Sequence, residues 1–323
     1  MTPYLLSIVL VLLILARADG FVFVGIVLAY LAVNGRLRGA LGYGLSVAIL
    51  SAPYVFWRHS YYNDFLPNTY YAKVAGTVYQ RVRYASRQLM DLSLSVGLLP
   101  HLMVTAAGFG VTVRDFRLRR FWSGEAIPFE GIAAVGWVGY WLYIGGDALN
   151  ERFVLILFAL GISALIRGLR HDLETRAGAF LLAVVLMLQL APLAMDPRFR
   201  LTLEKYDRWK TLGRFLAEAH PGQSIAVDAA GKIPYFSGLY TIDMLGLADT
   251  FVAHQEASFV VPGHSKSDAG YVLRRKPDLI AAYIGTRRDL FWGTRPEALR
   301  GGRIQAPVPC EHCETLGTEL WLA

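Results

Sequence analysis

The sequence is poor in charged residues and in cysteine. Charged residues make up 18% of the 323 residues, whereas hydrophobic residues make up 54%. Soluble domains average about 25% charged residues, so this composition favours a membrane protein. The only two cysteines, Cys310 and Cys313, form one Cys-x-x-Cys pair. Without a second pair this is weak support for zinc. The alternatives are a local disulfide, if this end lies outside the cytoplasm, and two thiols without a special role.

Common catalytic and nucleotide-binding motifs are also absent. The sequence has no Gly-x-Ser-x-Gly, no His-Glu-x-x-His and no phosphate-binding loop. The Gly-x-Gly pairs at Gly42 and Gly108 lie within apolar runs and lack the third glycine of a dinucleotide-binding fingerprint. No basic helix or RNA-binding aromatic motif accompanies the net charge of +7. We therefore expect no nucleic-acid partner and no certain cofactor, and a divalent metal ion stays open.

Apolar segments fill the first 195 residues. A membrane-spanning helix needs about 20 residues; four of the segments meet that length, and the first, second and sixth are short. The expected fold class is an α-helical polytopic membrane protein, with about seven membrane segments in residues 1–195 and a small extracytoplasmic α/β domain in residues 196–323. The segments are Tyr4–Ala16, Phe21–Val33, Ala40–Trp57, Leu89–Gly110, Ala126–Ile144, Phe153–Ile166 and Ala177–Met195.

Arginines between the apolar segments predict the orientation. Asn34–Gly39, Val111–Arg120 and Arg167–Arg176 are rich in basic residues and are therefore expected in the cytoplasm, as is the N-terminus. The loop 58–88 is then on the outer face, although it contains five basic residues. Two explanations remain open. These cations bind a phosphate, or Val78–Gln88 is an interfacial helix whose arginines contact lipid headgroups.

The C-terminal part has a different pattern. A helix is expected over Leu203–Ala219, since Trp209, Leu212, Phe215 and Leu216 form one apolar stripe. Short apolar runs predict strands at 224–228, 239–244 and 278–284, and Ser267–Arg275 is expected to be helical. Strands that alternate with helices predict a small α/β unit. The Gly- and Pro-rich stretch Gly293–Pro309 is expected to be a loop.

Three polar clusters interrupt the apolar segments on the expected outer face. They are Arg17–Gly20 (Arg-Ala-Asp-Gly), the aromatic stretch Tyr61–Lys73, and Gly145–Asp147 (Gly-Gly-Asp) followed by Arg152. Ionisable residues at the edge of a membrane are costly and often functional. The simpler alternatives are an ion-paired turn for the first cluster and a helix cap for the third. The region Tyr235–Asp249 is a fourth candidate.

One chemistry would unite these clusters. A lipid-linked phosphosugar would have its phosphate held by cations, its acceptor hydroxyl deprotonated by a carboxylate, and its sugar stacked on tyrosines. The candidate catalytic residues are Asp64 and Asp147; the donor phosphate-binding residues are Arg17, Lys73 and Arg152; the substrate-binding residues are Asp19, Asn68, Tyr70 and Tyr71.

Four sequence elements resemble a bacterial GT-C membrane glycosyltransferase group that includes the mycobacterial terminal arabinofuranosyltransferases. Arg17–Gly20 looks like the group's Arg-Pro-Glu-Gly element, and Tyr61–Lys73 is similar to its extracytoplasmic loop. Gly145–Asp147 with the following arginine, and the stretch Ala229–Asp249, also resemble it. The resemblance implies an inverting hexosyl- or pentosyltransferase in the bacterial inner membrane. It would move a sugar from a polyprenyl phosphate to a glycan or lipid acceptor.

The sequence departs from this group near its start. Such enzymes carry a catalytic aspartate well upstream of the Arg-x-[Asp/Glu]-Gly element, whereas only 16 residues precede Arg17 here. The resemblance therefore implies a fragment or a truncated relative. The alternative function is a non-catalytic membrane scaffold or accessory subunit with an extracytoplasmic binding domain.

Overall fold

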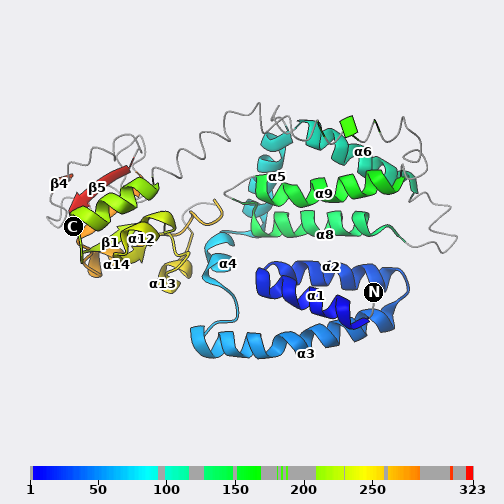
Figure 1. Cartoon of the computed structure of the whole chain (residues 1–323), viewed down its shortest axis with the longest axis horizontal. Helices are drawn as coiled ribbons and strands as arrows, with labels where there is room; N and C mark the ends of the chain where they lie inside the picture. The colour runs from blue at the N-terminus through cyan, green and yellow to red at the C-terminus, as the bar shows by residue number, and fades with distance from the viewer. Residues whose placement is uncertain are drawn as a thin grey trace. The chain divides into compact units, whose positions relative to one another are not determined.

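The structure, a computed structural model, divides the chain into two compact units (Figure 1). Unit 1 comprises Met1–Pro67 and Val82–Met195, and unit 2 comprises Asn68–Arg81 and Asp196–Ala323. The short segment Asn68–Arg81 thus belongs with the C-terminal residues. The described residues are 3–93, 99–115, 127–147, 151–168, 180, 183–184, 187, 209–228, 230–257, 261–283, 306–307 and 318–322.

Unit 1 is built from packed α-helices. Helix α2 contacts α1, α3 and α8, and α9 contacts α8 and α6, so these helices form successive layers (Figure 1). Leu10 and Ile14 of α1 pack with Val24 of α2 and Val47 of α3 in a buried cluster. The helices are α1 (Pro3–Ala16), α2 (Gly20–Val33), α3 (Leu37–Tyr62), α5 (Val78–Ser93, which begins in unit 2), α6 (Leu99–Asp115), α8 (Phe129–Ile144) and α9 (Glu151–Gly168).

The helix lengths correct the predicted polytopic membrane fold. Of the described helices, only α3, with 26 residues, is long and apolar enough to cross a membrane. Helices α1 and α2 have 14 residues each, which is about 21 Å of helix against a hydrocarbon core of about 30 Å. The fourth apolar segment, Leu89–Gly110, is divided between α5 and α6. The prediction of about seven spans was therefore wrong, because an apolar run shows which residues avoid water but not how long one helix is.

Unit 2 contains a five-stranded sheet with the order β2-β1-β3-β5-β4. Strands β1 (Ser224–Val227), β2 (Tyr240–Asp243) and β3 (Leu279–Tyr283) are parallel, and β5 (Thr318–Leu322) is antiparallel to β3 and β4 (Ala306–Pro307). The three predicted strands are confirmed. Strand β4 contradicts the expected loop at its two residues, and β5 was not predicted.

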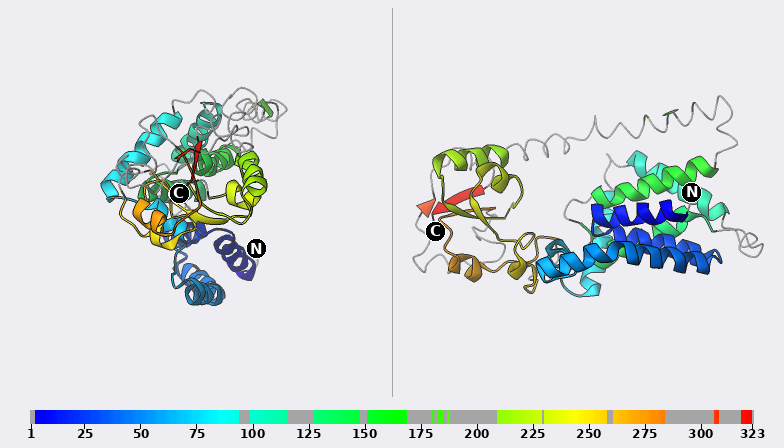
Figure 2. Two further views of the ribbon diagram at one scale, coloured as in Figure 1. Left: turned by 90° about the vertical axis from the view of Figure 1, so that its left-hand side faces the viewer. Right: turned by 60° about the horizontal axis from the view of Figure 1, so that its bottom comes forward.

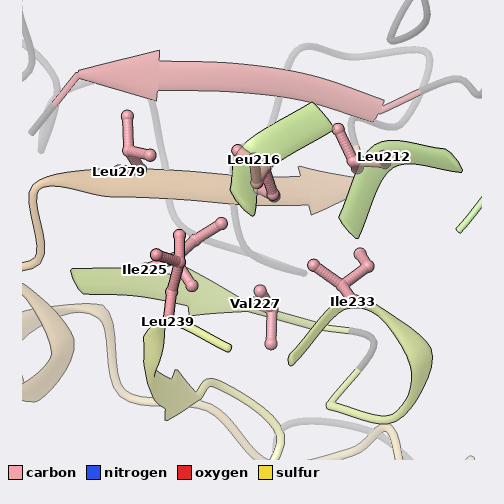
Figure 3. Close-up of a cluster of buried hydrophobic side chains, with 8 residues drawn as sticks. Leu212, Leu216, Ile225, Val227, Ile233, Leu239 and Leu279 are labelled. Atoms are coloured by element: carbon pink, nitrogen blue, oxygen red, sulfur yellow. The ribbon is translucent and has the colours of Figure 1, made fainter. Parts of the chain in front are cut away.

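Helices cover both faces of the parallel strands, because successive side chains of a strand point to opposite faces. On one face, the helical segment 209–219 and α12 (Lys232–Ser237) pack over β1 and β3 (Figure 3). The buried cluster on this face of the sheet consists of Leu212, Leu216, Ile225, Val227, Ile233, Leu239, Leu279 and Ala281. The stripe predicted for this helix is confirmed. On the other face, Ala226 and Ile280 pack against Val272 of α14 (Ala269–Arg274). Figure 2 shows the helical segment 209–219 and α14 on opposite sides of the strands.

Asp278 joins the starts of β3 and β1. Its Oδ2 accepts hydrogen bonds of 2.7 Å from both the backbone N–H and the hydroxyl of Ser224. In return, the Asp278 N–H donates to the Ser224 hydroxyl at 3.0 Å. The hydrogen bond from the Ser224 backbone is the main reason why the pKa of Asp278 is lowered from its ordinary value.

We expect this carboxylate to stabilise unit 2 only when it is ionised. Its folded-state pKa lies below the unfolded value of about 3.9, so the stabilisation is present above that pH and is lost as the pH falls through the folded pKa. Asp278→Asn should therefore speed hydrogen exchange of the β1 amides at pH 7 and have less effect near pH 3. Glu218→Gln, at an exposed carboxylate, is the control. An Asp278→Asn effect of equal size at both pH values would contradict the role of its charge.

Candidate functional site

The turn between α1 and α2 contains the predicted Arg17–Asp19 pair. Arg17 Nε lies 2.9 Å from Asp19 Oδ1, and half of the Arg17 side chain (49%) remains exposed. Asp19 stands at the N-cap position of α2 but makes no side-chain capping bond there. Its carboxylate therefore orients the guanidinium, and the exposed part of that group can meet an anionic ligand in the bidentate manner typical of arginine.

Phe153 connects this turn to α8 and α9. The Arg17 guanidinium carbon lies 5.2 Å from the centre of the Phe153 ring, within cation–π range. The ring stacks on Trp137 at 5.3 Å and meets Trp141 edge-on at 6.3 Å. Trp137 Nε1 also donates a 2.8 Å hydrogen bond to the Phe153 carbonyl. These contacts fix the start of α9, which includes Arg152; the side chain of Arg152 lies outside what the structure describes.

The Gly145–Asp147 segment follows α8 in a conformation that favours glycine. Gly145 and Gly146 have φ angles of 87° and 88°, in the left-handed region, and both donate their N–H groups to the Trp141 carbonyl. The Gln88 side chain bonds the Asp147 backbone, accepting from its N–H at 3.1 Å and donating to its carbonyl at 2.9 Å. Asp147 is 1% exposed, so a ligand would reach its carboxylate only through movement of this segment.

Trp141 has a buried donor beside this segment. Its Nε1 makes no hydrogen bond within the described part of the chain. It lies 3.1 Å from the position that a Cβ on Gly146 would occupy. Buried donors are rarely left unpaired in proteins, so this indole N–H is an unusual feature of the Gly145–Asp147 segment.

The aromatic stretch Tyr61–Lys73 is divided between the two units. In unit 1, Asp64 Oδ1 accepts a 3.1 Å hydrogen bond from the Leu66 N–H, which is the contact of an Asx-turn after α3. His59 and Phe65 stack with their ring centres 4.1 Å apart. One carboxylate oxygen of Asp64 thus shapes a turn, and its catalytic role stays a prediction.

The other candidates from this stretch lie in α4 (Asn68–Lys73), within unit 2. Asn68 Nδ2 donates to the Thr250 hydroxyl at 3.3 Å, and the Tyr71 ring lies 4.2 Å from the His254 ring. Tyr70 meets Tyr71 edge-on at 5.6 Å, and Lys73 is the half-buried last residue of α4. Asn68 and Tyr71 therefore bind α4 to α13 (Thr250–Ala253), a contact that sequence analysis did not foresee.

Helix α13 is itself held by charged side chains. Asp249 caps its first turn by accepting from the Val252 N–H at 3.1 Å. At its other end, Lys266 Nζ donates a 2.7 Å hydrogen bond to the Ala253 carbonyl. Lys266 is buried, and this burial lowers the pKa of its ammonium group. These two contacts fix both ends of α13, and α4 packs against the helix that they hold.

The candidate residues thus form two groups, one in each unit. Within the residues that the structure describes, no group of three or more His, Cys, Asp or Glu side chains could hold a metal ion. A family model described as a domain of unknown function, DUF8728, matches residues 199–313. No curated protein and no solved structure matched the sequence.

Proposed function

We propose that the chain binds a polyprenyl-phosphate-linked sugar through Arg17 and transfers the sugar to a glycan or lipid acceptor. The observation that carries this proposal is the meeting of three separate polar segments around Phe153. Arg17 lies over the ring, and Arg152 precedes Phe153 in the sequence of α9. Trp141 meets the ring edge-on, and its carbonyl accepts hydrogen bonds from Gly145 and Gly146, which precede Asp147. Residues far apart in sequence would thereby combine a cation, a buried donor and a carboxylate.

The chemistry assigns a role to each group. The exposed part of the Arg17 guanidinium would hold the donor phosphate, with Asp19 fixing its orientation. Asp147 would act as the general base that removes the proton from the acceptor hydroxyl. The resemblance of Arg17–Gly20 and Gly145–Asp147 to membrane glycosyltransferases supports the same chemistry. Helix α3 could anchor the chain in a bilayer and so keep it near a lipid-linked donor.

Binding of farnesyl phosphate to the full chain tests the phosphate-binding role. We expect Arg17→Gln to weaken the affinity about tenfold, because it removes one charge-assisted contact. Arg36→Gln makes the same change in charge at the exposed turn between α2 and α3, and should leave the affinity unchanged. Isothermal titration in detergent measures both. Equal affinities for wild type and Arg17→Gln would refute the assignment.

Release of farnesyl phosphate from farnesyl-phosphoryl hexoses and pentoses tests the transfer itself. Wild type should release it when an acceptor is present, and Asp147→Asn should not, while both bind farnesyl phosphate equally. If wild type binds farnesyl phosphate but releases none from any donor, the chain is a binding protein, which corresponds to the non-catalytic scaffold or accessory subunit.

A further inference from the structure

A second cluster of polar and aromatic side chains lies in unit 2. Arg275 Nη1 bonds Asp249 Oδ2 at 3.2 Å and also donates to the Tyr271 hydroxyl at 2.8 Å. The Tyr271 hydroxyl in turn donates to the same Asp249 oxygen at 2.9 Å. Arg275 Nη2 donates to the Tyr240 hydroxyl. We call Tyr240, Asp249, Phe251, Tyr271 and Arg275 the tyrosine–arginine cluster.

The rings of this cluster are partly exposed. Tyr240 is 63% exposed on β2, a strand at the edge of the sheet, and Phe251 of α13 is 44% exposed. Phe251 stacks on Tyr271 with ring centres 4.2 Å apart. The Arg275 guanidinium carbon lies 5.8 Å from the centre of the Tyr240 ring and 5.7 Å from that of Tyr271. Apolar ring surface and fixed hydrogen-bonding groups are therefore side by side.

The charges of the cluster balance. The carboxylate of Asp249 offsets the guanidinium of Arg275, and the hydrogen bond with Tyr271 raises the pKa of Arg275. The residues 196–323 as a whole contain 16 basic and 15 acidic residues. Within the cluster the one guanidinium is already paired with a carboxylate, which favours an uncharged ligand with many hydroxyl groups over a phosphate or an acidic peptide.

We propose that the tyrosine–arginine cluster binds a neutral oligosaccharide. The C–H face of a sugar ring can stack on Tyr240 or Phe251, and its hydroxyls can bond the Arg275–Asp249 pair. Aromatic side chains with a polar tip provide such mixed contact surface at low entropic cost. The inference rests on the proposed function, in which the oligosaccharide is the acceptor glycan or part of it.

The position of α13 adds support. Phe251 of this helix belongs to the cluster, while Thr250 and His254 contact Asn68 and Tyr71 of α4. Asn68 and Tyr71 are residues for which the sequence alone predicted sugar binding. Both sets of residues thus contact the same short helix of unit 2.

Saccharide binding to the full chain tests this inference. Maltohexaose, cellohexaose, xylohexaose and arabinohexaose serve as probes in saturation-transfer NMR and titration calorimetry. We expect at least one of them to bind, and Tyr240→Ala to weaken its affinity about tenfold, the loss of one stacking contact. Tyr79→Ala is the matched control, because Tyr79 is a tyrosine of unit 2 that is 73% exposed in α5, outside the cluster. Its affinity should equal that of wild type.

Two further variants separate the possible outcomes. Arg275→Lys keeps the charge but loses the planar fork, and should also weaken saccharide binding. Arg17→Gln should leave it unchanged, whereas it weakens farnesyl phosphate binding, so failure of one site is distinguishable from failure of the other. The inference is overturned if no probe binds to wild type. It is also overturned if Tyr240→Ala lowers only the melting temperature, since the cluster would then serve only to join β2, α13 and α14.

Discussion

Gly108→Ala is expected to destabilise unit 1 by about 3 kcal/mol, at the upper end of overpacking costs. A Cβ at Gly108 would lie 1.9 Å from the Gly161 carbonyl oxygen, 2.7 Å from its carbonyl carbon and 3.0 Å from its Cα. All three are backbone atoms of α9, so no side-chain rotation can relieve the overlap. The contact is equally close from the side of α9, because a Cβ at Gly161 would lie 2.5 Å from Thr105 Cα of α6. The two helices would have to separate.

Gly110→Ala is the matched control in the same helix. Among the described residues, no atom outside α6 itself lies within 4 Å of a Cβ at Gly110, and alanine is the better helix former. This variant should therefore be more stable than wild type by about 0.5–1 kcal/mol. Urea unfolding of the full chain, followed by tryptophan fluorescence, measures both variants. If the two alanines changed stability equally, the close contact of α6 and α9 would not exist.

The sequence predicted the positions of the helices of unit 1 more accurately than it predicted the helix lengths. Apolar runs lie where α1, α2, α3, α8 and α9 are found. Hydropathy, however, does not show where one helix stops and another begins, and the run Leu89–Gly110 spans parts of two helices. In unit 2 the strand predictions were accurate because β1 and β3 are central, apolar and short. Strand β5, which pairs with β3, was missed because Thr318–Leu322 (Thr-Glu-Leu-Trp-Leu) begins with two polar residues and has no run of β-branched residues.

The candidate site was predictable only where its contacts are local. Arg17 and Asp19 are two residues apart, so their ion pair follows from the turn that contains them. The Gln88 contact with Asp147 joins residues 59 positions apart, and the contact of Asn68 with Thr250 joins residues 182 apart. No spacing rule within one segment predicts such pairs. The aromatic stretch looked continuous in sequence, but the fold assigns its two halves to different units.

Gly146→Ala should also be strongly destabilising, by about 2–3 kcal/mol, for two reasons that can be separated. Its φ of 88° costs an L-residue roughly 1–2 kcal/mol. A Cβ would also lie 1.9 Å from Gln88 Oε1, and would displace the amide that bonds the buried backbone of Asp147. Gly139→Ala in α8 is the control and should not destabilise unit 1, because no atom outside α8, in the part of the chain that the structure describes, lies within 4 Å of the added Cβ.

A double-mutant cycle with Gln88→Ala separates the two reasons. Gln88→Ala alone removes both hydrogen bonds to Asp147 but also the atoms that an alanine at position 146 would meet. The double variant should therefore lose less stability than the sum of the single variants, by at least about 1 kcal/mol, because the overlap and the hydrogen bonds can each be lost only once. What remains in the double variant beyond Gln88→Ala is the cost of the backbone conformation together with the 3.1 Å approach of the Cβ to Trp141 Nε1. Strict additivity in urea unfolding would mean that the Gln88 side chain does not hold the Gly145–Asp147 segment, and the proposed base Asp147 would then need another support.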